Sequence, residues 1–142
     1  MINMQYVTIK CLLLICFSLT VNAQDIKPFS TDGCSLFPDG MPNDRTRWQT
    51  CCIQHDIQYW QGGSQEQRIR SDQELLHCVK KTGQEKIARL MHQGVRLGGA
   101  PWWPAPYRWG YGWPYLRGYK PLTQQEKQSV QRALEHYHKK IH

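Results

Sequence analysis

Two adjacent cysteines, Cys51 and Cys52, constrain the fold of this 142-residue chain more than any other feature. A bond between two neighbours in sequence would close a strained ring, so each of them is expected to bind a distant partner. The available partners are Cys34 and Cys78. One disulfide would tie the loop around Cys34 to the segment that holds the adjacent pair, and the other would tie that segment to the one that holds Cys78. The sequence leaves open which member of the pair takes which partner.

Residues 1–23 have the features of a signal peptide: Lys10 precedes an apolar run, and Ala23 is the small residue expected before a cleavage point. The run is too short to span a bilayer, which needs about 20 apolar residues for a thickness of about 30 Å. Cleavage as a lipoprotein before Cys16 is the weaker alternative, because an isoleucine stands where such a site has a small residue. We therefore expect a secreted or periplasmic protein whose single mature domain covers residues 24–142.

Removal of the signal peptide leaves four cysteines, and an even number in an exported chain indicates two disulfides rather than free thiols. It also lowers the formal net charge from +7 to +6, because Lys10 is the one charged residue removed. A basic exported domain favours contact with an anionic membrane surface over contact with nucleic acid. A soluble protein with a positively charged surface is the simpler alternative, and charge alone does not separate the two.

Capping signals and hydrophobic periodicity predict an all-α domain. Ser64 with Gln67, and Thr123 with Glu126, have the spacing of a capping box, which begins a helix. Glycines follow the first three periodic segments and are expected to end them. The predicted helices run from Asn43 or Asp44 to about Trp60, from Ser64 to about Thr82, from Glu85 to Leu97 and over residues 123–140.

Asp72 occupies an unusual position for a carboxylate. It falls inside the apolar stripe of the second predicted helix, three positions after Ile69 and four before Leu76. A buried carboxylate without a partner is costly enough that it would normally become neutral, so a hydrogen-bond donor is expected beside it. His55, on the first predicted helix, is the obvious candidate.

The first predicted helix carries polar residues that indicate a hydrolytic metal site. His55 and Tyr59 lie one turn apart on one face, and Cys52 and Asp56 lie one turn apart as well. A zinc site built from His55 and three cysteines is a weaker alternative. An oxidising compartment favours disulfides, and adjacent cysteines do not fit the usual spacer between zinc-binding residues.

The pattern Cys-Cys-x-x-His-Asp-x-x-Tyr over residues 51–59, followed by Asp72 and Cys78, resembles the helical motif of the secreted phospholipase A2 family. The Asp-Gly-Cys-Ser run at residues 32–35 resembles a variant of the calcium-binding loop of that family. The resemblance covers residues 32–79, and the remainder of the chain has no counterpart.

This resemblance implies a small disulfide-stapled phospholipase A2-like domain with two antiparallel core helices. It also implies an exported, calcium-dependent hydrolase that cleaves the sn-2 ester bond of a glycerophospholipid. His55 would remove a proton from the attacking water, a role that suits an imidazole near neutral pH. Asp72 would orient the imidazole and stabilise its charged form, and Tyr59 would hold Asp72 in place.

The family resemblance further implies a bound calcium ion that polarises the ester carbonyl. Asp56 would be its carboxylate ligand. Backbone carbonyls of Gly33, Ser35 and Phe37 would supply further ligands, because calcium takes about six to eight oxygens. The loop departs from the family pattern, in which a glycine follows the cysteine directly. Loss of calcium binding would leave a noncatalytic lipid- or protein-binding module, which is the alternative function.

Residues 101–121 form a Pro- and Gly-rich segment that is unusually aromatic, with four tryptophans and four tyrosines interleaved with Arg108, Arg117 and Lys120. Its prolines and glycines exclude a long helix. Aromatic and basic side chains together are typical of a surface that meets lipid headgroups. Aromatic residues are also large contributors to small cores, so a lid that packs on the helices is slightly favoured.

Overall fold

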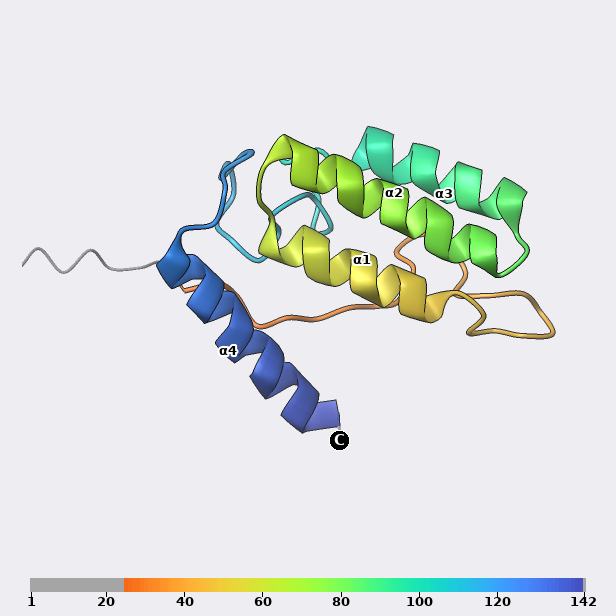
Figure 1. Ribbon diagram of the computed structural model, residues 1–142, viewed down its shortest axis with the longest axis horizontal. Helices are drawn as coiled ribbons and strands as arrows, with labels where there is room; N and C mark the ends of the chain where they lie inside the picture. Colours follow the sequence, from red (N-terminus) through yellow and green to blue (C-terminus); the bar gives the residue numbers. More distant parts are fainter. Residues whose placement is uncertain (1–24, 142) are drawn as a thin grey trace, which may run out of the picture.

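The computed structural model describes residues 25–141, and the predicted signal peptide, residues 1–23, lies outside the described residues. The described part contains no β-strand beyond an isolated bridge. Its four α-helices are α1 (Gln49–Gln61), α2 (Gln65–Lys81), α3 (Glu85–Gly98) and α4 (Gln124–Ile141) (Figure 1). The prediction of a small all-α domain is confirmed for this part of the chain. None of these helices is long and apolar enough to cross a membrane.

Helices α1, α2 and α3 pack together, and each runs antiparallel to the one before it (Figure 1). The turn between α1 and α2 is short, and α2 begins with a capping box. The Ser64 hydroxyl accepts the backbone N–H of Gln67 at 3.3 Å, and the Gln67 side chain accepts the backbone N–H of Ser64 at 2.7 Å. Two orphan N–H groups at the helix start are thereby satisfied, and the predicted start of this helix is correct.

The predicted start of the first helix is wrong. A cap was expected at Asn43 or Asp44, but α1 begins at Gln49, after Trp48, which makes no side-chain capping hydrogen bond. Asp44 instead closes a tight turn with Met41, and the two residues exchange backbone hydrogen bonds of 2.8 and 2.9 Å. Because these bonds satisfy the backbone outside a helix, the turn replaces the expected first helical residues.

Two disulfides join the helices and the loop, as predicted, and they resolve the pairing that the sequence left open. Cys34 binds Cys52, and Cys51 binds Cys78. The first ties the loop to α1, and the second ties α1 to α2. A native disulfide of this kind stabilises a small domain by roughly 2–4 kcal/mol. With all four cysteines oxidised, the alternative zinc site does not form among them.

The aromatic segment 101–121 covers the C-terminal end of α1. The buried indoles of Trp109 and Trp113 donate hydrogen bonds of 3.0 and 2.8 Å to backbone carbonyls at this end of the helix. The carbonyl of Gln61, the last residue of α1, lacks a partner within the helix, so the Trp113 indole supplies both packing and a hydrogen bond there. The Trp109 indole does the same for Gly63 in the turn that follows. Trp102 and Trp103 are exposed instead, so the favoured interpretation as a lid holds for only part of the segment.

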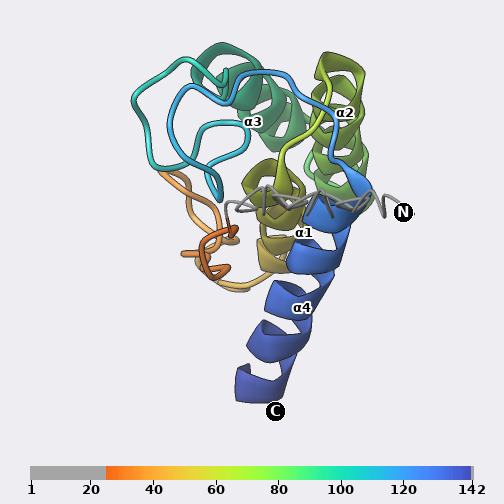
Figure 2. The same ribbon diagram turned by 90° about the vertical axis from the view of Figure 1, so that its left-hand side faces the viewer.

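Helix α4 extends away from the other three helices (Figures 1 and 2). Its bounds agree with the prediction to within one residue. Val130 is buried, and Tyr137 packs edge-on against Phe29 with ring centroids 4.8 Å apart. Ile141, which the periodicity places in the same apolar stripe, is exposed, since the end of α4 projects beyond the rest of the described chain.

Candidate active site

The side chains of His55 on α1 and Asp72 on α2 meet in the interior. The Nε2 atom of His55 lies 3.0 Å from Oδ1 of Asp72, and the two side chains are 7% and 0% exposed. A carboxylate at this distance favours the tautomer in which Nε2 carries the proton and donates it in a hydrogen bond. The other ring nitrogen, Nδ1, is then a proton acceptor.

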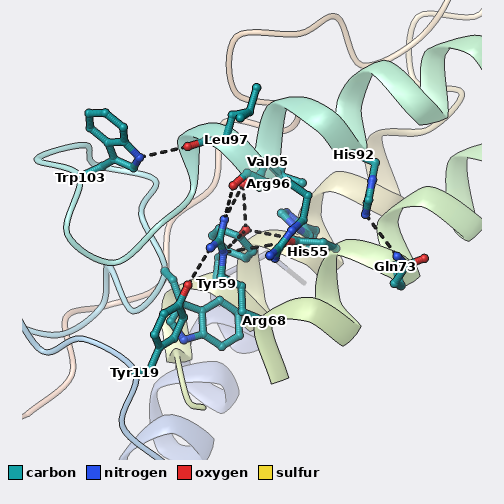
Figure 3. A network of polar contacts seen from close by, with 12 residues as sticks. His55, Tyr59, Arg68, Gln73, His92, Val95, Arg96, Leu97, Trp103 and Tyr119 are labelled. Atoms are coloured by element: carbon teal, nitrogen blue, oxygen red, sulfur yellow. Dashed lines mark hydrogen bonds and ion pairs between the residues drawn. The ribbon is translucent and has the colours of Figure 1, made fainter. Parts of the chain in front are cut away.

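Four side chains surround the carboxylate of Asp72, and Figure 3 labels all four of them: His55, Tyr59, Arg68 and Arg96. Oδ1 accepts hydrogen bonds from His55 and from the hydroxyl of Tyr59 at 2.7 Å. Oδ2 accepts one from Arg96 at 2.7 Å and lies 3.8 Å from Nε of Arg68. Burial alone would raise the pKa of Asp72, but the hydrogen bonds outweigh it and hold the pKa below its usual range. Asp72 is therefore a carboxylate in the folded protein.

The sequence interpretation missed both arginines of this network. Arg68 lies four positions before Asp72 on α2, inside the same stripe, and is 3% exposed. An arginine among apolar stripe residues was an available signal for an ion pair with Asp72. Arg96 lies on α3, and no sequence pattern links it to Asp72, because their contact depends on how α3 packs against α2.

A cavity of about 360 Å³ opens beside this network. His55 and Asp56 contribute polar atoms to its wall. Most of the remaining wall is apolar and comes from the Cys34 loop, α2, α3 and the aromatic segment, including Phe37, Leu75, Leu90, Met91, Val95 and Tyr107. Leu90, which the periodicity directs into the core, lines this cavity and is half exposed. The cavity therefore offers an apolar compartment next to a proton acceptor.

The carboxylate of Asp56 faces the loop around Cys34 rather than the space between the helices. The hydroxyl of Thr31 donates a hydrogen bond of 2.6 Å to its Oδ2. Burial, opposed by that hydrogen bond and assisted by the negative charges of Asp32 and Asp39, raises the pKa of Asp56 to about 7. A cation bound here would relieve the electrostatic cost of ionising Asp56.

The loop residues Gly33, Ser35 and Phe37 line the same cavity as Asp56. Within residues 25–141, no three His, Cys, Asp or Glu side chains are arranged to hold a metal ion by themselves. A cation at Asp56 would therefore need backbone carbonyl oxygens from the loop. Such an all-oxygen set fits calcium and fits zinc poorly, so the chemistry of the available donors agrees with a calcium ion.

The altered loop is held by its own hydrogen bonds. The N–H of Gly33 donates to the hydroxyl of Thr31 at 3.1 Å, and the N–H of Cys34 donates to Oδ1 of Asp39 at 2.7 Å. The second oxygen of Asp39 accepts from the side chain of Gln49 at 3.0 Å. Both loop amides thus have partners within the protein, and Asp39 holds the loop against the start of α1.

The fold and this site together define a class: a small disulfide-bonded helical domain with a buried His–Asp pair beside an apolar cavity and an acidic loop site. The chain matches no family model, no curated protein and no solved structure. The function is therefore inferred from the geometry of the site and from the motif.

Proposed function

We propose that this protein is an exported, calcium-dependent hydrolase that cleaves the sn-2 ester of glycerophospholipids, like the phospholipase A2 family that its motif resembles. The observation that carries the proposal is the buried His55–Asp72 pair, 3.0 Å apart, whose histidine lies in the wall of an apolar cavity of about 360 Å³. An oriented imidazole is a suitable general base, and an apolar cavity suits an acyl chain.

In the proposed reaction, Nδ1 of His55 takes a proton from a water molecule as the water oxygen attacks the ester carbonyl carbon. The bond between that carbon and the glycerol oxygen then breaks, and the proton on His55 passes to the glycerol oxygen. The products are a free fatty acid and a lysophospholipid, and no covalent acyl-enzyme forms. Asp72 stabilises the positive charge that His55 carries between the two proton transfers.

Calcium, when bound, would supply positive charge for the ester carbonyl and the phosphate of the substrate. Asp56 would hold it together with backbone carbonyls of Gly33, Ser35 and Phe37. The raised pKa of Asp56, about 7, supports this role, because burial and neighbouring carboxylates make its ionised form costly without a counter-charge.

Exposed apolar side chains near the cavity support contact between the enzyme and a membrane surface. Leu36 and Leu90 line the cavity and are 88% and 55% exposed. Leu36 also has a φ of 60°, a conformation that leucine rarely adopts. Leu97 and Trp103 are exposed and linked by a 3.0 Å hydrogen bond from the indole to the Leu97 carbonyl. The positive net charge of the chain would favour an anionic surface.

The test is fatty acid release from mixed phospholipid vesicles by the purified mature domain, with calcium and then with a chelator. We expect release with calcium only, and faster release when anionic lipid is included. Binding of the protein to the vesicles is measured in parallel by sedimentation. Binding without release under both conditions would instead support the noncatalytic lipid-binding module.

Enlarging Gly94 is expected to separate stability from activity. This α3 residue lines the cavity, and a Cβ added there meets no atom within 4 Å. Gly94→Ala should stabilise the helix by roughly 0.5–1 kcal/mol and keep activity. Gly94→Leu should also fold, but its side chain should enter the cavity and reduce hydrolysis of long-chain lipids more than of short-chain lipids. Equal rates for Gly94→Leu and wild type on long-chain lipid would contradict an acyl site there.

A further inference from the structure

The two oxygens of Asp72 are bound from different directions. Oδ1 accepts from His55 and Tyr59 on α1, and Oδ2 accepts from Arg96 on α3 at 2.7 Å. Partners on Oδ1 alone would leave the carboxylate able to turn about its Cβ–Cγ bond. The bond from Arg96 opposes that rotation, because turning the group would break a charge-assisted hydrogen bond.

We propose that Arg96 is a positioning residue for the reaction: it fixes the Asp72 carboxylate and thereby the orientation of the His55 ring. This inference rests on the proposed function, because it assigns Arg96 to the same hydrolytic site. Arg96 does not line the cavity, so it acts through Asp72 rather than by contact with the substrate.

Arg68 has a different role in the same network. Its guanidinium donates to the carbonyls of Val95 and Arg96 at 2.8 and 3.0 Å, and to the hydroxyl of Tyr119 at 2.7 Å. The two carbonyls belong to the last turn of α3, and the Val95 carbonyl also accepts the backbone N–H of Gly99 at 3.0 Å. Arg68 thus holds the backbone of Arg96 in place and is almost fully buried. Its replacement would disturb the packing of three segments.

Arg96 is the better subject for mutation, since its side chain is 33% exposed and Asp72 keeps three other partners without it. Helix α3 also lines the cavity through Met91 and Val95. One helix therefore both shapes the proposed acyl compartment and holds the carboxylate that orients the base. A small displacement of α3 would change both at once.

The first readout is steady-state kinetics of Arg96→Ala. We expect kcat to fall by about 10-fold to 100-fold, the usual cost of loosening a group that orients a reacting residue, with little change in KM. Guanidinium chloride, well below unfolding concentrations, should restore part of kcat by occupying the vacated space, and Arg96→Lys should lose less than Arg96→Ala. The matched control is Arg89→Ala, because Arg89 lies on the same helix, exposed and paired with Glu85. It should behave as wild type.

The second readout does not depend on activity. The Nε2 proton of His55, hydrogen-bonded to Asp72, should give a downfield proton NMR signal in wild type and in Arg89→Ala. In Arg96→Ala this signal should broaden through faster exchange with water, and guanidinium should sharpen it again. Unchanged kcat and an unchanged signal in Arg96→Ala would overturn the positioning role. If the NMR signal changes as expected in Arg96→Ala but the wild-type protein hydrolyses no lipid, the proposed function alone would be contradicted.

Discussion

Replacement of His55 by glutamine is expected to abolish lipid hydrolysis while the fold remains intact. The glutamine amide can still donate a hydrogen bond toward Asp72, so the buried carboxylate keeps a partner at a distance close to the present 3.0 Å. An amide cannot accept a proton near neutral pH, and a general base contributes about 10²-fold to 10⁴-fold to a rate. The measurement is the initial rate of fatty acid release with saturating calcium.

The control for this variant is His77→Gln, which changes an exposed histidine on α2. Near-ultraviolet circular dichroism and the melting temperature should match wild type for both variants. Residual activity of His55→Gln within tenfold of wild type would rule out His55 as the base. Loss of activity accompanied by unfolding would call for a second variant, His55→Asn, whose shorter amide is tested in the same way.

Asp56→Asn is expected to remove the calcium dependence of the protein. The amide keeps the size of the side chain, and its oxygen can accept the hydrogen bond that Thr31 now donates at 2.6 Å. The asparagine lacks the negative charge of Asp56, which is the one charge that α1 contributes to the proposed calcium site. We expect hydrolysis to fall by at least about 10²-fold, a typical loss when electrostatic stabilisation of a developing oxyanion is removed. Calcium should raise the melting temperature of wild type and leave that of the variant unchanged.

The raised pKa of Asp56 also predicts a pH dependence of stability in the metal-free protein. The pKa rises from the ordinary value of 3.8 to about 7 on folding, so the folded state favours the protonated acid. Stability from this group is present below pH 3.8 and is lost as the pH rises toward about 7 and above. An asparagine at this position cannot ionise, so Asp56→Asn does not lose stability as the pH rises. At pH 8 in chelator the variant should therefore melt at a higher temperature than wild type.

The exposed Asp44→Asn variant provides the control for both measurements. It should keep the calcium response and the pH profile of wild type. An equal calcium-induced rise in melting temperature for wild type and Asp56→Asn would place the cation elsewhere and contradict the role of Asp56.

Local signals predicted the helices well where the local interactions decide the structure. The capping box at Ser64 and Gln67 forms as expected, because its two hydrogen bonds join residues three apart. The start of α1 was missed for the opposite reason. Asp44 has the chemistry of a cap, but its backbone is already bonded to Met41 in a turn that no short pattern indicates.

The candidate site likewise contains one contact that the sequence could predict and others that it could not. The contact between His55 and Asp72 was predictable, because periodicity puts a carboxylate in a buried stripe and burial demands a donor. Arg96 was not predictable, since its bond to Asp72 depends on the register of α3 against α2. The sequence also could not tell which of Cys51 and Cys52 binds Cys34 and which binds Cys78. Neighbouring residues on a helix point in different directions, and the spacing in the sequence does not say which direction faces which partner.

The decisive measurement is mass spectrometry of the products from an anionic phospholipid whose sn-1 and sn-2 acyl chains differ in mass. With calcium, the wild-type domain should release the sn-2 fatty acid and leave the lysophospholipid that retains the sn-1 chain. Chelator and the His55→Gln variant should both leave the lipid intact. Intact lipid with wild type and calcium, or release that persists in the His55→Gln variant, would contradict a hydrolase that depends on His55.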